Sequence, residues 1–432
     1  MDKTYLMNMT TAKKFILYGM ILFLTILRLN GQDVTPQEIQ RQIQGQILAA
    51  KPGDTVQIPA GNLRLVRSIY IENQSRITLM GQGKDQTILS FAHQEEGMEA
   101  LRVFNSRDIR LEGFSIEDPN GDAIIVQNVQ GIMLKDIRAG WTKNLTNPEH
   151  SHGVFIDKSN RILIDSCEAY AAINAGVYIR QSRDLIIQGS FFHQNSVGIS
   201  IINSSNSEIH HNISKYNAIG MAIYNLPGLL VYGEGSKIYK NEISENNIRL
   251  LSPSTYFNHS FPAGTGIAVM SFEKVAIFKN EIVNNKTLGV HISDFSFLKS
   301  PISLPEKILE NKIIYKSVAA YQAEQDTSFN PFFHEINIFD NTFYREEQKP
   351  FTNHFLSRLL SDYYKKNPPS IVLTQNLANQ TKQDVSSLCL VDNRNMSFVE
   401  INHKEALDNP PTDITKYNCK LPPLDPVSLY KN

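Results

Sequence analysis

The sequence predicts an all-β fold, a parallel β-helix of about ten coils, and two repeating patterns carry this prediction. In the first, an aliphatic residue recurs roughly every 22 to 39 residues, and a corner position follows three residues later. In the second, a small residue precedes alternating aliphatic residues, as in Gly176-Val177-Tyr178-Ile179. Alternation with a period of two indicates short strands with one buried face, and such strands bury that face when successive coils stack.

Both patterns run through most of the chain. The aliphatic series is Leu79, Leu111, Leu134, Ile164, Ile187, Ile209, Ile238, Ile277, Ile308 and Ile338. The corner series is Cys167, Ser190, Asn212, Asn241, Asn280, Asn311 and Asn341. Asparagine amides at equal corners can form hydrogen bonds from coil to coil. We therefore expect residues 59–344 to form the β-helix repeats.

Two segments with separate roles precede the repeats. A pair of lysines stands before the apolar run Phe15–Leu27, which is short for a membrane span and typical of a secretory signal. We expect residues 1–31 to be a signal peptide, with an N-terminal membrane anchor as the alternative. Residues 32–58 are expected to form a helical cap and the first strand, because Thr35-Pro36-Gln37-Glu38 is a capping box with proline at the first helical position.

Residues 345–432 are expected to form a small C-terminal cap that packs along the last coils. There the outward position after the aliphatic series becomes apolar, and its members are Tyr239, Phe278, Leu309 and Phe339. An exposed apolar stripe of this size needs a cover. The amphipathic stretch Phe351–Lys366, which two prolines end, is the segment expected to cover it.

Composition limits the partners. The chain has 42 Lys+Arg and 43 Asp+Glu, a net charge of −1, which argues against a nucleic-acid-binding surface. Beyond the signal no segment is long and apolar enough to span a membrane, so we expect an exported protein in the periplasm, at the cell surface or in the medium. In such an oxidising compartment Cys389 and Cys419 can form a disulfide bond, and Cys167 then remains a buried free thiol.

Several motifs carry a resemblance to known proteins. They are Pro52-Gly53-Asp54-Thr55-Val56, Leu226-Pro227-Gly228, Pro262-Ala263-Gly264-Thr265-Gly266, Asn341-Thr342-Phe343, Cys389 and Cys419-Lys420-Leu421-Pro422-Pro423-Leu424. Over roughly residues 48–432 the chain resembles the right-handed parallel β-helix proteins of the pectate-lyase-like superfamily. More closely, it resembles an exported bacterial group described as parallel β-helix domain-containing proteins. The resemblance implies a right-handed helix and a place outside the cytoplasm, but no reaction.

Two activities of that superfamily are disfavoured. Mannuronan epimerases of this fold carry an Asp-Pro-His-Asp/Glu motif. The most similar segment of this sequence, Asp118-Pro119-Asn120-Gly121-Asp122, lacks the histidine. The Asn-Thr-Asp, Asp-Asp and Gly-His-Gly motifs of polygalacturonases are missing from the sequence. A divergent lyase is compatible with both observations.

Insertions into a regular coil indicate where a site is expected. Residues 141–151 and 248–264 lengthen loops that enter the glycine-headed strands, and residues 226–235 and roughly 294–304 lengthen loops that leave them. All four flank one sheet face and are expected to wall a groove over it. In the superfamily that the chain resembles, polysaccharides bind to this face.

Alternation gives the outward residues of that face. Phe155 and Tyr178, on neighbouring coils, are expected to stack on a sugar ring. The expected substrate contacts are Phe155, Tyr178, Trp141 and Arg102, and the expected catalytic residues are His152, Arg180, Lys143 and Asp157. In a competing interpretation Asp157 and Arg180 form only a surface ion pair, and Trp141 plugs a covered aromatic pair.

The chemistry of a uronic-acid polymer suits these residues. Eliminative cleavage needs a base near the C5 proton and a cation beside the carboxylate, which His152, Arg180 and Lys143 can supply. A Ca²⁺ held by Asp122, Asp157 or Glu149 can replace that cation, so the expected cofactor is either none or calcium. Hydrolysis needs two carboxyl groups about 5–9.5 Å apart, whereas Asp122 and Asp157 are expected to lie about 16–17 Å apart.

Two classes of function are therefore open. The first is an exported enzyme that acts on an acidic polysaccharide, with a lyase or epimerase favoured over a hydrolase. The second is a non-catalytic exported β-helix that binds a glycan or a surface partner through the same groove. Because a net charge of −1 describes only the total, Arg102, Lys143 and Arg180 can still form a local basic spot in that groove.

Overall fold

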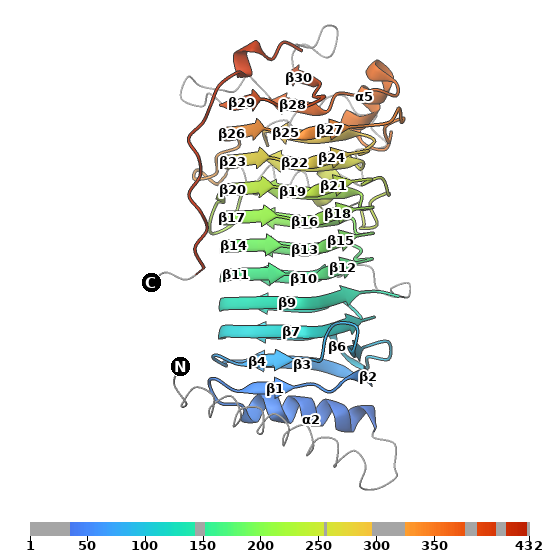
Figure 1. Ribbon diagram of the computed structural model, residues 1–432, viewed down its shortest axis with the longest axis vertical. Coiled ribbons are helices and arrows are strands. Elements are labelled where there is room, and N and C mark those ends of the chain that lie inside the picture. Colours follow the sequence, from blue (N-terminus) through green and yellow to red (C-terminus); the bar gives the residue numbers. More distant parts are fainter. Residues whose placement is uncertain are drawn as a thin grey trace, which may run out of the picture.

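The computed structural model describes residues 35–142, 152–254, 257–295, 325–375, 387–402 and 412–429. Figure 1 shows the chain wound into stacked coils that form one elongated solenoid. Two parallel sheets run along it, one of eleven strands and one of nineteen. The expected signal peptide lies outside the described residues. Among the described residues, no helix has the length and apolar character needed to cross a membrane.

The eleven-stranded sheet, called sheet B, takes one strand from each coil. In spatial order its strands are β3 (Arg67–Glu72), β6 (Glu96–Phe104), β8 (Ile124–Gln127), β10 (His152–Asp157), β13 (Ala175–Arg180), β16 (Val197–Ile202), β19 (Ile219–Tyr224), β22 (Thr265–Met270), β25 (Leu288–Ser293), β28 (Ile371–Gln375) and β30 (Phe398–Asn402). These include the glycine-headed strands of the sequence. Their parallel register places Phe155 opposite Tyr178 and Asp157 opposite Arg180, as the alternation predicts.

The nineteen-stranded sheet, called sheet A, contains two rows of strands. The first row is β1 (Thr55–Gln57), β4 (Thr78–Met80), β7 (Arg107–Glu117), β9 (Gln130–Gly140), β11 (Asn160–Asp165), β14 (Arg183–Gln188), β17 (Ser205–His210), β20 (Glu234–Tyr239), β23 (Glu273–Phe278), β26 (His334–Phe339) and β29 (Leu388–Val391). The second row is β2 (Gly61–Arg64), β5 (Thr87–Ser90), β12 (Glu168–Tyr170), β15 (Phe191–His193), β18 (Ile213–Lys215), β21 (Glu242–Ser244), β24 (Glu281–Val283) and β27 (Thr342–Tyr344). The long strands β7 and β9 contribute to both rows and so join them.

The aliphatic series forms a buried column inside the first row. Leu111, Leu134 and Ile164 are opposite one another on β7, β9 and β11, and each is fully buried. One member of the series is wrong. Strand β23 pairs directly with β26, so Ile277 is opposite Ile338 and no coil lies between them. Ile308 and Asn311 lie outside the described residues, and their spacing matches the repeat only in sequence.

The corner series forms a hydrogen-bonded ladder. Asn212, Asn241, Asn280, Asn341 and Asn393 follow one another, and from Asn241 on each amide oxygen accepts from the backbone N–H and the side-chain amide of the asparagine before it. A second asparagine ladder stands at the corner between the second row of sheet A and sheet B. It consists of Asn195, Asn217, Asn246 and Asn285. The sequence analysis missed it, although its spacing matches that of the first ladder.

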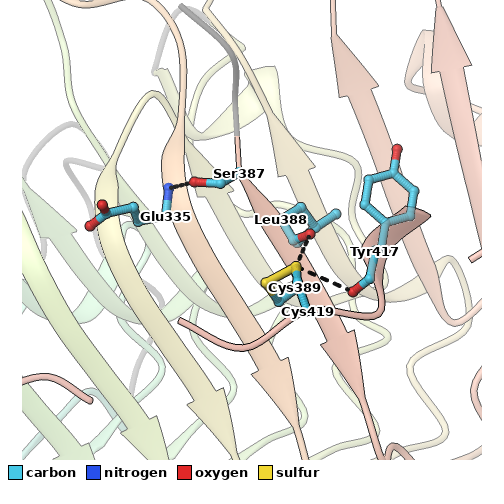
Figure 2. The surroundings of a disulfide bond; sticks show 6 residues. All are labelled: Glu335, Ser387, Leu388, Cys389, Tyr417 and Cys419. Atoms are coloured by element: carbon cyan, nitrogen blue, oxygen red, sulfur yellow. Dashed lines mark hydrogen bonds between the residues drawn. A yellow bond between two sulfur atoms is a disulfide. The ribbon is translucent and has the colours of Figure 1, made fainter. Parts of the chain in front are cut away.

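Helix α2 (Pro36–Ala49) lies across the first coil (Figure 1). Thr35 and Glu38 form the reciprocal hydrogen bonds of the capping box, and Ile43 and Ile47 are buried in the core. At the other end Cys389 and Cys419 form a disulfide bond, which joins β29 to the turn after the short 3₁₀ helix η3 (Thr415–Tyr417) (Figure 2). Burial raises the pKa of the free Cys167 thiol to about 12.

The cover expected from Phe351–Lys366 lies elsewhere. Helix α5 (Phe355–Tyr364) places Leu356 and Leu360 against Leu288, Val372 and Val399, so it covers sheet B and not the outer stripe of sheet A. The stripe needs no helix, because its rings stack on each other. The Tyr239–Phe278 and Phe278–Phe339 ring centroids are each 4.9 Å apart, with nearly parallel planes.

The C-terminal segment, residues 412–429, runs back along sheet A towards the early coils (Figure 1). The Lys237 ammonium donates to the carbonyl of Asp425 at 2.6 Å, and the Glu208 carboxylate accepts from the backbone N–H of Val427 at 2.8 Å. Leu429 then lines a surface pocket together with Met133 and Leu163 of the early coils. This end of the chain therefore packs on the solenoid along several coils.

Candidate functional site

The outward face of sheet B is open over the early coils and covered over the middle ones. The outward residues of β16, β19 and β22 are buried, and they are Ser200, Ile202, Ala222, Tyr224, Ala268 and Met270. Phe257 and Phe261 pack on the Tyr224 ring, with centroids 5.2 and 5.4 Å from it. The insertion at residues 248–264 therefore lies on the face and does not wall a groove there. The partly exposed outward side chains belong to β6, β8, β10 and β13.

On β10, His152 is held by an acidic residue of the preceding coil. The Asp122 carboxylate accepts from the His152 backbone N–H at 2.8 Å and contacts the ring atom Nδ1 at 2.8 Å. The imidazole is almost fully buried, at 7% exposure. Its other nitrogen, Nε2, has no hydrogen-bond partner among the described residues. An Nδ1–H that donates to Asp122 leaves Nε2 with a free lone pair, which is the arrangement of an oriented general base.

The aromatic pair lies beside this imidazole. The His152 ring centroid is 4.7 Å from that of Tyr178 and 5.4 Å from that of Phe155. The Phe155 and Tyr178 rings stack on each other at 5.5 Å and 10°, so part of each ring face is occupied by its neighbour. Both side chains are partly exposed. The pair therefore offers ring edges and the remaining ring area to a sugar.

Arg180 completes the cluster from β13. Its guanidinium donates to both carboxylate oxygens of Asp157, at 2.9 and 3.4 Å, and its Cζ lies 5.3 Å from the Phe155 ring centroid. Asp157 is 3% exposed and also accepts from the Gln181 side chain. A carboxylate this deeply buried needs its cation, so this ion pair fixes the arginine over the aromatic ring.

Two expected substrate contacts have other roles. Trp141 is buried in the core at 5% exposure, and its indole N–H donates to the Pro119 carbonyl at 3.0 Å, so it does not stand on the open face. It bonds to Pro119 and does not cover the aromatic pair, because Phe155 and Tyr178 are both partly exposed. Arg102 is on the open face, but its Nε lies 2.9 Å from the carboxylate of Glu99. Lys143 and Glu149 lie outside the described residues.

The described residues do not fit a calcium site. Asp122 binds His152, and Asp157 binds Arg180 and Gln181, so neither carboxylate is directed at a common point. Within the described ranges, no three His, Cys, Asp or Glu side chains gather as metal ligands would. Calcium needs six to eight oxygen ligands, which two separately engaged carboxylates do not provide.

The comparisons with known proteins concern the fold. Residues 138–301 match the family described as the right handed beta helix region. The protein is a right-handed parallel β-helix. No curated protein matches the sequence of this β-helix.

Solved structures that the β-helix resembles differ in their functions. The A-module of the mannuronan C-5 epimerase AlgE4 from Azotobacter vinelandii is 14% identical, with 83% of this chain and 90% of that one covered and a TM-score of 0.40. PfbA, a surface adhesin of Streptococcus pneumoniae, is 12% identical, with 87% and 91% covered and a TM-score of 0.49. A DFA-IIIase from Arthrobacter chlorophenolicus is 10% identical, with 87% and 84% covered and a TM-score of 0.48.

Sequence reasoning missed two side chains that control the charge of this face. Glu99 forms an ion pair with Arg102. Alternation could not predict which face Glu99 occupies, because the register shifts between β3 and β6. Gln181 binds Asp157 from the turn after β13, where alternation no longer applies. The Glu99–Arg102 pair had one sequence signal, which is that the two opposite charges lie three residues apart.

Proposed function

We propose that this β-helix is exported and binds an acidic polysaccharide across the open part of sheet B, where it acts as a lyase or epimerase on uronate residues. One observation carries the proposal. His152 has one ring nitrogen fixed by Asp122 and the other, Nε2, buried without a partner among the described residues, and its ring packs against the partly exposed Phe155 and Tyr178. A buried polar atom left unpaired costs free energy, and a catalytic role is one reason for a protein to retain it.

The proposed reaction starts at C5 of the uronate. His152 Nε2 takes the C5 proton, and the electron pair of that C–H bond passes towards the carboxylate. In a lyase the C4–oxygen bond then breaks, a C4–C5 double bond forms and the leaving oxygen takes up a proton. In an epimerase a proton returns to C5 from the opposite face. Both reactions require a cation near the carboxylate, and Arg180 lies on the adjacent coil.

One observation favours a second function, a binding module without catalysis. Both arginines that the structure describes on the open face have carboxylate partners, Glu99 for Arg102 and Asp157 for Arg180. A substrate carboxylate would have to share Arg180 with Asp157. If the ion pair holds, the face binds sugar by its aromatic edges and hydrogen bonds alone.

A panel of polymers distinguishes the two functions. Alginate, pectate and chondroitin are incubated with the protein, with and without Ca²⁺, and the ultraviolet absorbance of unsaturated uronate ends and the epimer content are followed. The proposal expects turnover of at least one polymer and its loss in Asp122→Asn, which keeps the shape but weakens the hold on His152. Binding of a polymer without any change in it would support the binding module. Export is tested by fractionation of the producing cells.

A further inference from the structure

A cavity opens at a corner of the solenoid between the second row of sheet A and sheet B, far from His152. Its lining includes Asn285, Phe343, Arg345, Asn367, Asn395 and Ser397. It lies beside β25 and β28, four strands along sheet B from β13. At about 4.8 Å per strand, that separation is roughly 19 Å along the solenoid axis.

The cavity exists because the second asparagine ladder stops. Asn246 donates to Asn285 across adjacent coils, but Asn285 has no asparagine to follow it. Val283 is opposite Tyr344, so the position that would continue the ladder is Glu346, and its side chain is exposed. From that point the chain leaves the corner to form α5 and returns at Ser370. The corner that three earlier coils fill is thereby left open.

Arg345 lines this opening, and the described residues offer its guanidinium no acidic partner. The contacts that the structure gives the guanidinium are hydrogen bonds to two backbone carbonyls, those of Thr287 and Pro368. Among the described residues, no carboxylate lies within ion-pair distance of it, and burial lowers its pKa to about 10. A guanidinium has five N–H donors, so several remain for a ligand. A partly buried cation paired only with carbonyls is incompletely compensated.

The remaining lining is suited to a sugar. Asn395 contributes an amide, and Ser397 contributes a hydroxyl that is bonded to Ser370. Tyr344, at 55% exposure, adds an aromatic ring to the lining. Glu347 is the acidic group at the rim, where it accepts from Asn367 at 3.3 Å. Glu347 adds repulsion at the mouth, so a ligand with one negative charge suits the cavity better than one with two.

We infer that this cavity is a second ligand site, which binds the carboxylate of a single uronate residue through Arg345 and its hydroxyl groups through Asn395 and Ser397. Arginine forms paired hydrogen bonds with a planar carboxylate, and the two acceptor oxygens match its fork. The site does not depend on proton transfer at His152, because it shares no residue with the open face of the early coils. It can hold a uronate whether or not the other site is catalytic.

Titration with monosaccharides tests this inference. Glucuronate and galacturonate are titrated into the whole protein in a calorimeter. Methyl glucoside is the control for a sugar without a carboxylate, and inorganic phosphate is the control for negative charge without a sugar. We expect saturable uronate binding, at least tenfold weaker binding of methyl glucoside and phosphate, and a loss of at least tenfold in Arg345→Gln. Phosphate binding as tight as uronate binding, or no uronate binding at all, would overturn the assignment.

Two further variants separate recognition from folding. Arg394→Gln removes an exposed arginine of the neighbouring coil outside the cavity lining, and it should bind uronate like the wild type. Arg345→Lys keeps the charge but loses the fork, so it should fold normally and bind uronate several-fold more weakly. Equal binding by wild type, Arg345→Lys and Arg345→Gln would place the uronate elsewhere and refute the inference. An unchanged His152-dependent turnover in Arg345→Gln is expected in every case.

Discussion

Replacing Asn241 by alanine is expected to destabilise the protein strongly, because this side chain is a buried interior member of the first asparagine ladder. Its amide oxygen accepts from the backbone N–H and the amide of Asn212, at 2.9 and 3.1 Å. Its amide nitrogen donates to the carbonyl of Ile209 and to Asn280, at 2.8 and 3.0 Å. The residue is 2% exposed, so water cannot replace these bonds.

The expected magnitude follows from the groups left without partners. The Asn212 amide keeps its bond to Ile187, and the Asn280 amide oxygen keeps the backbone N–H of residue 241. The Asn212 backbone N–H and the Ile209 carbonyl lose their bonds to the removed side chain. At about 1–3 kcal/mol for each buried unpaired group, the substitution should cost about 2–6 kcal/mol.

Asn393 is the matched control, because it makes the same contacts at the end of the ladder. Its amide oxygen accepts twice from Asn341 and its nitrogen donates to Ile338, but it is only partly buried. Water can therefore replace its bonds, and Asn393→Ala should cost only about 1 kcal/mol. Urea unfolding is followed by circular dichroism and by the fluorescence of Trp141, the single tryptophan. An Asn241→Ala that is no less stable than Asn393→Ala would refute this reasoning.

Three further predictions concern stability and reactivity. Burial lowers the pKa of His291 to about 3, so this histidine is neutral in the folded protein. The stability that the neutral form contributes is complete above the unfolded pKa of about 6.5 and is lost as the pH falls below it. Between pH 7 and pH 5 the free energy of unfolding of the wild type should fall by about 2 kcal/mol more than that of His291→Asn. Parallel pH profiles of the two free energies of unfolding would contradict this. Reduction of Cys389–Cys419, which closes a separation of 30 residues, should cost about 3–4 kcal/mol on the loop-entropy model; an unchanged urea midpoint would show that the bond constrains little. Cys167 should not react with thiol reagents in the folded protein at pH 8 and should react once per chain in denaturant, and rapid labelling of the folded protein would contradict its burial.

The parts of the fold that repeat with a short period could be predicted from the sequence. Alternation with period two placed Phe155, Asp157, Tyr178 and Arg180 on the same outward face, and their register is as predicted. It works because neighbouring strands in a parallel coil carry equivalent residues at equivalent positions. It failed at Ile308, because the segment between Ile277 and Ile338 is long enough to imitate two repeats, although β23 and β26 pair directly.

The surfaces on which the insertions pack could not be predicted, because they depend on contacts between segments that are distant in the sequence. Nothing near Phe261 in sequence indicates that it packs on Tyr224 and closes the middle of sheet B. The amphipathic character of α5 predicted a helix, but two apolar surfaces were available and the sequence does not say which one it covers. The exposed candidate site is therefore smaller than the sequence suggested.

The most direct test of the proposed site follows the C5 protons of a uronate polymer by proton NMR in D₂O, since a lyase and an epimerase both remove them. The reaction at His152 predicts that the wild type depletes the C5 signal of at least one acidic polymer and that His152→Ala does not. His193→Ala is the matched control, because His193 also bonds to a carboxylate, Glu168, but on sheet A, and it should deplete the signal like the wild type. A C5 signal that stays constant with every polymer, or that His152→Ala depletes at the wild-type rate, would contradict catalysis at this site.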